Sequence, residues 1–481
     1  MNDMPFVKLF KSRYGYYIYD VNTNRIIDIT EKNYFNLEKI LRANCKVDDG
    51  EIAQVLSDPE FQSLIEKGML KSKYPEKIEM PESSKLPYFL NHKLHILTLQ
   101  VTQQCNFRCR YCHYTYGDDV QYHSHNSSTM SWATAKAAID FFARRTRDSL
   151  YVTIGFYGGE PLLEYELVKK CIEYCQTVFE GKILAFAITT NAFLLTPEKA
   201  KFLIDNNTTI LVSLDGPQEI HNKNRKNAGD GSGTFESVMN NLKKIEEELP
   251  EYYKKITYNS VVDPANDCGK VNNFFKCDMF KNRIIKTSSL QPTVGKRAYY
   301  SEEYISSSKK DQVIALLAKV KVFNTSEIST ISKNYLERIN MFERQMRSFN
   351  ELPSIMGHSG PCKPGIFKLF VTTRGDLFPC ERLKDNSNVM KIGSVFSTIN
   401  ESKVDFLYNV GHVCDERCAA CWNIRHCKIC ATKINDGKSL SPEMCAYECK
   451  YDCLETERQI KQIIAIREFK NKIYRRSVAN E

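Results

Sequence analysis

Three cysteines with close spacing lie early in the chain, in the stretch QQCNFRCRYC. Cys105, Cys109 and Cys112 fall within eight residues, in the pattern C-x3-C-x2-C. Thiolates this close in sequence can bind a metal from a single loop. Structural zinc usually takes four protein ligands, and the fourth here would be the adjacent and strained His113. A cubane iron–sulfur cluster on three thiolates keeps one iron open for an outside ligand. The spacing therefore favours a cluster over zinc.

A second field of cysteines lies in the C-terminal third. Ten of the 18 cysteines fall between Cys362 and Cys453. In a reducing compartment, clustered cysteines are more often metal or cluster ligands than disulfides. The run C-x2-C-x5-C-x2-C from Cys418 to Cys430 could alternatively hold zinc.

The composition indicates a soluble globular chain. Of its 481 residues, 42% are hydrophobic and 26% are charged, which is ordinary for such proteins. No apolar run approaches the ~20 residues that span a bilayer, and the N-terminus lacks the apolar core of a signal peptide. We therefore expect a cytoplasmic protein with no membrane partner. The net charge of +9 is mild, and without a basic stripe it predicts no nucleic-acid partner.

The elements that position the first cysteines follow a repeating pattern of strand, loop and helix. Buried strands are predicted at 95–102, 151–159, 183–191, 209–216, 255–263 and 283–290. Helical stretches between them indicate a parallel α/β sheet with right-handed crossovers. In parallel α/β barrels the active site lies at the carboxyl ends of the strands. The cysteine loop and the stretches YGGEP, TTN and SLDGP all lie at such ends.

The rest of the chain divides into smaller parts. YGYYIYDV and RIIDI, joined by the turn NTN, predict a hairpin followed by helices up to residue 70. Residues 74–89 are proline-rich and polar, as in a linker. Residues 303–350 are predicted to be helical. The field from 362 to 453 shows little periodicity, and a final helix is predicted from 454.

The cysteine loop and the strand-end stretches resemble the radical S-adenosylmethionine (SAM) superfamily. The resemblance rests on C-x3-C-x2-C with an aromatic residue before the last cysteine, on GGEP, and on TTNAFLL, in which Ala192 replaces a glycine. SLDGP, HNKNR and GSGTF, between residues 213 and 235, resemble a run found in peptide-modifying members.

This resemblance implies an α/β fold with a partial (β/α)6 TIM-like barrel, in which Cys105, Cys109 and Cys112 hold a [4Fe-4S] cluster and its open iron binds SAM. Glu160 would accept from the SAM ammonium, Ser213 would bind the ribose, and Arg225 would grip the carboxylate as a charge-matched fork. It assigns no catalytic side chain. The residues implied to bind SAM are Tyr111, Gly158, Gly159, Glu160, Asn191, Ser213 and Arg225.

The C-terminal field resembles the SPASM extension of radical SAM enzymes, which implies two auxiliary [4Fe-4S] clusters. By this resemblance Cys362, Cys380 and Cys430 would hold the first cluster. The second would be held by Cys418, Cys421, Cys427 and a late cysteine, with Cys445 or Cys449 favoured over Cys453. Two residues precede Cys430 where the family usually has three. Cys414 either closes the first auxiliary cluster or leaves it open to a substrate thiolate, and both alternatives stay open.

The N-terminal unit resembles the winged-helix-like module that recognises leader peptides. Such a module binds a leader as an added strand at its sheet edge. A plain structural cap is the alternative, and no basic recognition helix indicates DNA binding. The resemblance implies four parts: residues 1–88 for leader recognition, 89–300 as the radical SAM core, 301–355 as a helical bridge and 356–481 as the SPASM domain.

These features together predict an enzyme that abstracts hydrogen from a ribosomal precursor peptide with a 5′-deoxyadenosyl radical. Its expected partners are the leader and core of that peptide and a reductant such as flavodoxin or ferredoxin. A thioether between a cysteine sulfur and a carbon is the favoured product. The alternatives are anaerobic sulfatase maturation to formylglycine, carbon–carbon crosslinking, epimerisation and peptide decarboxylation. A zinc-dependent DNA-binding scaffold is the non-enzymatic alternative.

Overall fold

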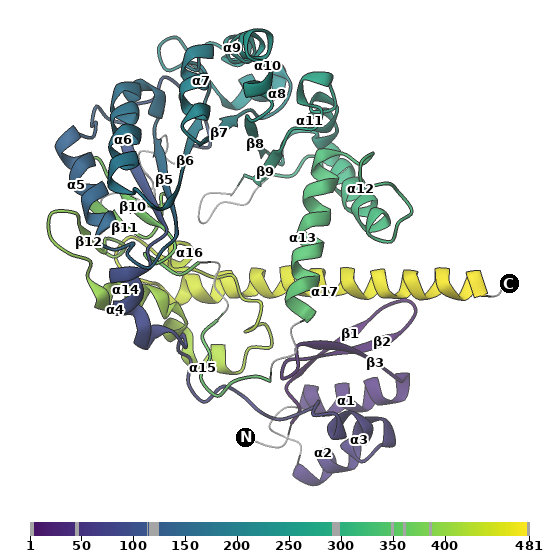
Figure 1. Ribbon diagram of the computed structural model, residues 1–481. Coiled ribbons are helices and arrows are strands. Elements are labelled where there is room, and N and C mark those ends of the chain that lie inside the picture. The colour runs from purple at the N-terminus through teal and green to yellow at the C-terminus, as the bar shows by residue number, and fades with distance from the viewer. Residues whose placement is uncertain are drawn as a thin grey trace.

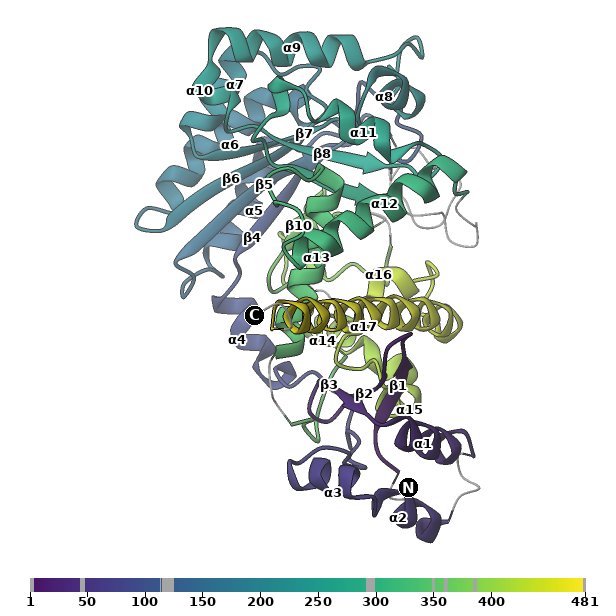
Figure 2. The ribbon, with the colours of Figure 1, turned by 90° about the vertical axis from the view of Figure 1, so that its right-hand side faces the viewer.

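The computed structural model contains one large and one small sheet, with a long helix between the domains that they form. It describes residues 4–43, 48–112, 114, 125–290, 299–347, 351–358, 362–383 and 387–478. Helix α17 (Pro442–Val478) runs between the barrel and the N-terminal domain in both views (Figures 1 and 2). None of the described helices is long and apolar enough to cross a membrane.

Six parallel strands make up one side of the nine-stranded sheet, out to its edge, and confirm the predicted repeat. In spatial order they are β4 (Ile96–Thr102), β5 (Tyr151–Gly158), β6 (Ile183–Thr190), β7 (Thr208–Ser213), β8 (Thr257–Val262) and β9 (Ile285–Ser289). Each pairs in parallel with the next. Because all six run the same way, the loops after them gather at one end of the barrel.

Helices cover the outer face of this sheet (Figure 1). They are α5 (Trp132–Ala143), η3 (Pro161–Glu164), α6 (Tyr165–Val178), α7 (Pro197–Asp205), α8 (Gln218–Asn224), α9 (Phe235–Glu248), α10 (Pro250–Tyr253), α11 (Cys268–Phe274) and η4 (Asp278–Phe280). Leu97, Leu99, Ile154 and Phe156 are buried on that face. Side chains alternate along a strand, so the polar and half-buried positions between them line the barrel interior.

Three short strands extend the sheet past β4, which the sequence did not predict. They are β10 (Leu369–Val371), β11 (Asp376–Phe378) and β12 (Gly393–Ser394). Strands of two or three residues are too short to show alternation, and β10 is recognisable only by its parallel pairing with β4, where Leu369 lies opposite Leu97. The C-terminal cysteine field is thereby tied to the strand that leads into the first cysteine loop.

Helix α17 begins at Pro442, so the prediction that the final helix starts at 454 was wrong. Ser441 accepts the Met444 N–H at 3.2 Å and Pro442 occupies the first helical position, two ordinary start signals. The late cysteines therefore lie on helix rather than loop, four residues apart on one side. The other C-terminal helices are α14 (Glu401–Tyr408), η5 (Val410–Cys414), α15 (Asp415–Ala419) and α16 (Ala431–Ile434).

Helices α12 (Glu302–Lys319) and α13 (Thr330–Arg347) confirm that the stretch 303–350 is helical. Helix α13 extends from the barrel toward α17 (Figure 1). There Ile339 and Phe342 share one apolar core with Ile460 and Ile463 of α17. The bridge thus fixes the long helix against the barrel.

The N-terminal domain is a three-stranded antiparallel sheet with three helices. Its elements are β1 (Val7–Lys11), β2 (Tyr16–Asp20), β3 (Arg25–Ile29), α1 (Glu31–Ala43), α2 (Asp49–Leu56) and α3 (Pro59–Glu66). The β2–β3 hairpin was predicted, whereas β1 was not. The sequence of β1 is short and flanked by lysines, which is typical of an exposed segment. The predicted linker at 74–89 contains η2 (Ser83–Lys85) and leads into α4 (Leu86–His92).

The small domain is fastened to the C-terminal region by polar contacts. Tyr17 donates to Glu468 at 2.6 Å, and Arg467 donates to the Ile26 carbonyl at 2.9 Å. The His426 Nε2 lies 3.1 Å from the Tyr19 hydroxyl and 3.0 Å from the Asn24 side-chain oxygen. The domain therefore rests on α17 and on the chain around the C-terminal cysteines.

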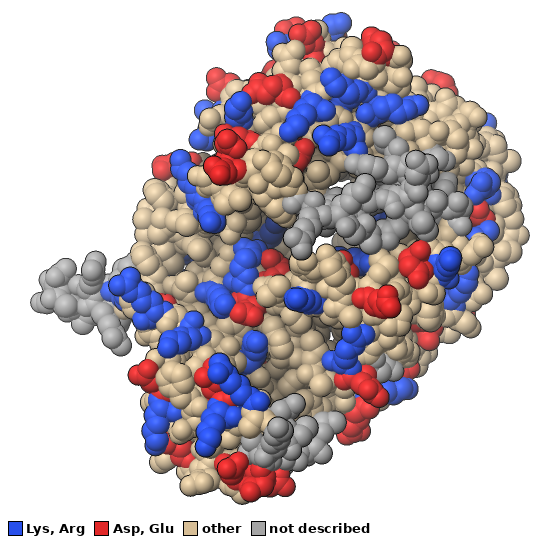
Figure 3. Space-filling view, turned by 180° about the vertical axis from the view of Figure 1, so that it is seen from behind, with Lys and Arg blue, Asp and Glu red and all other residues tan. Residues whose placement is uncertain are grey.

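Surface charge is mixed on the face seen in Figure 3, where Lys and Arg are interspersed with Asp and Glu over the barrel and the lower domain. The absence of a nucleic-acid partner stays a prediction.

Candidate functional site

The cysteine loop is held against the end of β5 by two glycines. A side chain on Gly158 (φ +141°) would place its Cβ 2.1 Å from the Thr102 carbonyl oxygen, and one on Gly159 would lie 2.0 Å from that of Gln104. The Gly159 N–H donates to Thr102 at 3.0 Å, and the Glu160 N–H donates to Gln104 at 2.9 Å. Only glycine permits this approach, so GGEP fixes where the loop begins.

The Glu160 carboxylate joins the ends of β5 and β6. It is 1% exposed and accepts from the Leu162 N–H at 3.0 Å, the Thr190 hydroxyl at 2.7 Å and the Asn191 N–H at 2.8 Å. Burial raises the pKa of Glu160, and these donors oppose the shift. Its predicted contact with the SAM ammonium stays a prediction.

Asn191 connects β6 to the cysteine loop. Its side-chain nitrogen donates to the Asn106 oxygen at 2.8 Å and lies 3.9 Å from the Cys105 sulfur. Ala192 adopts φ +60°, so it keeps the left-handed backbone expected of the glycine that it replaces. The Asn106 Nδ2 is buried with no hydrogen-bond partner among the residues described, and this unused donor lies beside Cys105.

Each of the three thiols of the loop receives an N–H donor. Cys105 accepts from the Phe107 amide at 3.3 Å, Cys112 from the Tyr114 amide at 3.4 Å, and Cys109 from Arg225 at 3.8 Å. Burial raises the pKa of Cys109 to about 12, while Arg225 lowers it. Three thiols with such donors, next to the unused Asn106 amide, fit an iron–sulfur cluster, whose sulfur ligands are commonly hydrogen-bonded.

No group of three or more His, Cys, Asp or Glu among the described residues is arranged to hold a single metal ion. A cubane cluster does not require such convergence, because it takes each thiolate at a different iron. His113, the strained ligand of the zinc alternative, lies outside the described residues.

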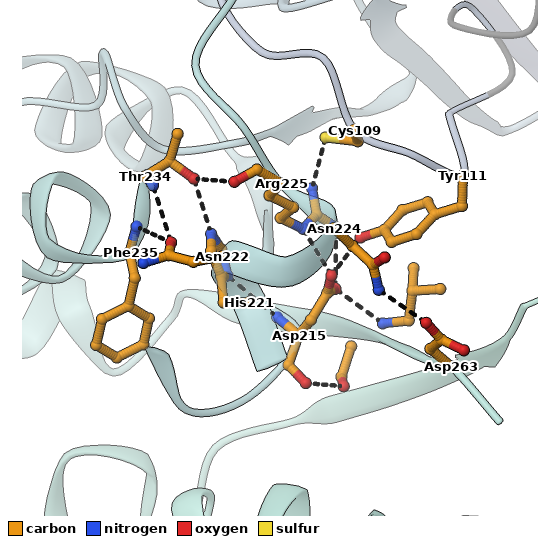
Figure 4. Close-up of polar contacts among 12 residues, drawn as sticks. Cys109, Tyr111, Asp215, His221, Asn222, Asn224, Arg225, Thr234, Phe235 and Asp263 are labelled. Carbon is orange, nitrogen blue, oxygen red and sulfur yellow. Dashed lines mark hydrogen bonds and ion pairs between the residues drawn. The ribbon is translucent and has the colours of Figure 1, made fainter. Parts of the chain in front are cut away.

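A buried ion pair lies against the loop from the other side (Figure 4). Asp215, at the end of β7, is 0% exposed and accepts Arg225 Nε at 3.0 Å and Nη2 at 3.1 Å. The Tyr111 hydroxyl also donates to this carboxylate, and the Arg225 guanidinium lies 5.4 Å from the Tyr111 ring centroid. The pair thus joins the cysteine loop to β7 and α8.

Backbone pairing reinforces this connection. The Arg110 N–H donates to the Asn224 carbonyl and the Arg108 N–H to that of Lys226, both at 2.8 Å. His221, buried behind the pair, contacts the Asp215 N–H and the Thr234 hydroxyl. The stretches SLDGP, HNKNR and GSGTF therefore pack together as one support for the loop. Asp215 lies within SLDGP, a stretch in which the resemblance implies a role for Ser213 alone.

Ser213 and Tyr157 lie on the interior side of the barrel. Ser213 ends β7 opposite Asn259 of β8, and Tyr157 lies opposite Gln100 of β4. Burial raises the pKa of Tyr157, and both Cys112 and Cys380 add to the shift. Tyr157 therefore lies near both the first cysteine loop and the C-terminal field.

Cys362, Cys380 and Cys430, predicted to act together, are neighbours in space. Burial raises the pKa of Cys362, and Cys430 raises it further. Burial also raises the pKa of Cys380 to about 12, with contributions from Cys362 and Cys430.

Cys414 lies with the cysteines at the start of α17. The Cys445 and Cys449 sulfurs are 3.9 Å apart. The pKa of Cys445 is raised by its hydrogen bond to Cys449, by burial and by a hydrogen bond to Cys414. Arg417 donates to the Cys414 sulfur at 2.8 Å. These contacts place Cys414 near the predicted second set.

The remaining thiols of the second set adjoin the same helix. Burial raises the pKa of Cys427, and Cys449 and Cys421 add to this. A hydrogen bond from Cys453 lowers the pKa of Cys421 to about 7, against burial. Cys418 is half-buried on α15. The set thus gathers around α17, and Cys453 belongs to the same neighbourhood.

Comparisons with known proteins show what the barrel region is similar to. A family model described as Radical SAM superfamily matches residues 99–268. A serine-type anaerobic sulfatase-maturating enzyme of Bacteroides thetaiotaomicron is 30% identical over 160 residues, which is 33% of this chain and 38% of the relative. A cysteine-type anaerobic sulfatase-maturating enzyme of Clostridium perfringens is 26% identical over 386 residues, covering 75% of this chain and 93% of the relative.

A solved structure titled native anSMEcpe with bound AdoMet and Cp18Cys peptide superposes with a TM-score of 0.52 and 20% identity. It covers 78% of this chain and 99% of that chain. The chain spans less than half the length of the first curated relatives that it matches. The likeness to the solved structure confirms the α/β fold, and the family model makes residues 99–268 similar to the Radical SAM superfamily.

Proposed function

We propose that this chain is a radical SAM enzyme that installs a thioether in a ribosomally made precursor peptide. The observation that supports it most is the cysteine loop, which is fixed at the carboxyl ends of the barrel strands with three hydrogen-bonded thiols. A reduced cluster and SAM bound there would supply a radical able to abstract hydrogen from an unactivated carbon. The enzyme would work in the cytoplasm with flavodoxin or ferredoxin as reductant.

The chain's own residues would hold and shield this chemistry. Cys105, Cys109 and Cys112 would hold the cluster, and Asn106 has an unused donor beside it. Ser213 and Asn259 project from paired positions into the interior, where hydroxyl and amide groups suit the SAM ribose. The helical layer outside the sheet would exclude water from the reacting atoms.

The grouping of the C-terminal thiols supports thioether formation over a closed electron relay. Cys362, Cys380 and Cys430 are mutual neighbours, whereas Cys414 contacts Cys445. Three thiolates would leave the first auxiliary cluster with an open iron for a substrate thiolate. Cys418, Cys421, Cys427 and Cys445 or Cys449 would hold the second, with Cys414 or Cys453 adjoining.

The N-terminal domain supports a peptide substrate. β3 is an edge strand of its sheet, and an edge strand offers unpaired backbone groups to an incoming peptide. The domain is fastened to α17, whose first turns carry the late cysteines. A leader bound here would therefore be tethered near the C-terminal field.

The second candidate function is anaerobic sulfatase maturation. The similarity to sulfatase-maturating enzymes, which extends over 75% of this chain in one relative, favours it. Sulfatase maturation differs from thioether formation in its substrate, which is a sulfatase segment, and in its product, which is an aldehyde.

Metal analysis and peptide products together test the proposal. Anaerobic reconstitution should give about 12 irons per chain for three cubane clusters, and zinc without iron or sulfide would refute it. The reconstituted enzyme is then incubated with SAM, reductant and cysteine-rich peptides encoded beside its gene. Mass spectrometry should show the loss of two hydrogens and one blocked thiol. An aldehyde formed in a sulfatase-derived peptide, with no crosslink, would establish the second function instead.

A further inference from the structure

We infer that Asp215 and Arg225 form a positioning pair that sets the reduction potential of the cluster held by the cysteine loop. The inference rests on the proposed function, because that potential exists only if the loop binds a cluster. It assigns Arg225 a role toward the cluster sulfur, in addition to any contact with SAM.

The Asp215 carboxylate is saturated by donors from three parts of the fold. It accepts two N–H groups from Arg225, the Tyr111 hydroxyl of the cysteine loop, and the Val261 amide of β8 at 3.1 Å. Its backbone carbonyl also accepts from Ser260 at 3.0 Å. A fully buried carboxylate with this many donors is fixed in its place.

Three nitrogens of the Arg225 guanidinium donate hydrogen bonds within the protein. Arginine has five N–H donors, and here Nε and Nη2 serve Asp215 while Nη1 donates to the Cys109 sulfur at 3.8 Å. Its side chain is 7% exposed. One of the two guanidinium edges that could bind a SAM carboxylate in bidentate fashion, the Nε–Nη2 edge, is therefore used by Asp215, and Nη1 is directed at Cys109.

A cation that donates to a cluster thiolate stabilises the reduced cluster, which carries one more negative charge. Hydrogen bonds to the sulfurs and local charge are among the features that set iron–sulfur potentials. Asp215 opposes this effect by neutralising Arg225. The two residues therefore act in opposite directions: loss of Arg225 lowers the potential, and loss of the Asp215 charge raises it.

The test is a redox titration of reconstituted full-length enzyme by electron paramagnetic resonance. The cluster of the loop is recognised by the change that SAM causes in its spectrum. We expect Arg225→Gln to shift its midpoint potential down, and Asp215→Asn to shift it up. The double variant Asp215→Asn/Arg225→Gln removes both charges, and its midpoint potential should lie between those of the two single variants. This variant keeps the test decisive if a single variant does not fold.

Asp263→Asn is the matched control. Asp263 is also a buried strand-end carboxylate, and it accepts the Asn224 side chain at 3.1 Å rather than Arg225. This variant should leave the potential unchanged. SAM affinity is measured on every variant by equilibrium binding.

Two results would overturn the inference. One is a midpoint potential that shifts in the same direction in both single variants, or that shifts in neither of them. The other is weaker SAM binding by Arg225→Gln at an unchanged potential, which would make Arg225 a SAM ligand only. A wild-type enzyme with no SAM-responsive cluster signal would instead refute the proposed function itself.

Discussion

Individual residues at the site act mainly by permitting close backbone approach and by satisfying buried charge. Gly158 and Gly159 allow β5 to meet the start of the cysteine loop, and Glu160 holds three donors at the same point. The cysteines and these glycines could be predicted, because their types and spacing are distinctive. Asp215 could not, since a single aspartate at a strand end has many ordinary uses, and only the fold brings it to Tyr111 and Arg225.

Substitution of Gly159 by alanine should disorganise the cysteine loop. The new Cβ would lie 2.0 Å from the Gln104 carbonyl oxygen, and overpacking of this kind costs about 2–3 kcal/mol in stability. We expect lower unfolding free energy in urea and loss of SAM cleavage. Gly229→Ala is the control, because its Cβ would meet only a side-chain oxygen at 3.5 Å. Normal cleavage by Gly159→Ala would contradict the assigned role of this contact.

His221 should make the protein less stable in mild acid. Burial, with help from Arg225 and against Asp215, lowers the pKa of His221 from 6.5 to about 3. Between these values the unfolded chain binds a proton that the folded chain does not. Stability from this group is therefore complete above pH 6.5 and falls by about 1.4 kcal/mol per pH unit below it.

Urea denaturation from pH 7.5 to pH 5 measures this effect. The wild type should lose about 2 kcal/mol more than His221→Asn over that range, although the variant is less stable at neutral pH because its hydrogen bonds are altered. Parallel pH profiles for the two proteins would show that His221 does not titrate as expected.

At the scale of elements, long strands were predictable and short ones were not. The six barrel strands have buried apolar positions in alternation or in runs, which the sequence displays directly. The strands β10 to β12 exist because they pair with β4 and with each other, and such pairing leaves no local pattern. The early start of α17 was missed because its first turns are rich in cysteine, which suggested a ligand loop.

Strand β3 should bind the leader peptide through its outer edge. The Ile26 carbonyl points away from β2, since it accepts from Arg467, and alternate residues of a strand face the same way. The Asp28 N–H is therefore expected to face the open edge. Asp28→Pro removes this donor and should weaken precursor binding about fivefold, the equivalent of one hydrogen bond of about 1 kcal/mol.

Binding is measured by fluorescence anisotropy with the labelled leader segment, and thermal unfolding reports stability. Asp28→Ala is the matched control, because it changes the side chain but keeps the N–H. Equal binding by both variants would place the leader elsewhere.

At the scale of the whole molecule, α17 connects the parts that the proposed reaction needs. It carries late cysteines at its start, shares a core with the helical bridge, and supports the N-terminal sheet (Figures 1 and 2). The sequence indicated separate parts but not their arrangement, because the contacts join residues more than 400 positions apart. The position of Cys414 beside Cys445 likewise depends on the complete fold.

The central claim is that the loop of Cys105, Cys109 and Cys112 binds the cluster that cleaves SAM. The most direct measurement compares 5′-deoxyadenosine release by reconstituted wild type and by the Cys105→Ala/Cys109→Ala/Cys112→Ala variant, with dithionite as reductant. The wild type should release 5′-deoxyadenosine. The variant should release none, while it retains the iron and visible absorption of the C-terminal clusters. Cleavage by the variant at the wild-type rate, or a wild type that is inactive with its full iron content, would contradict the claim.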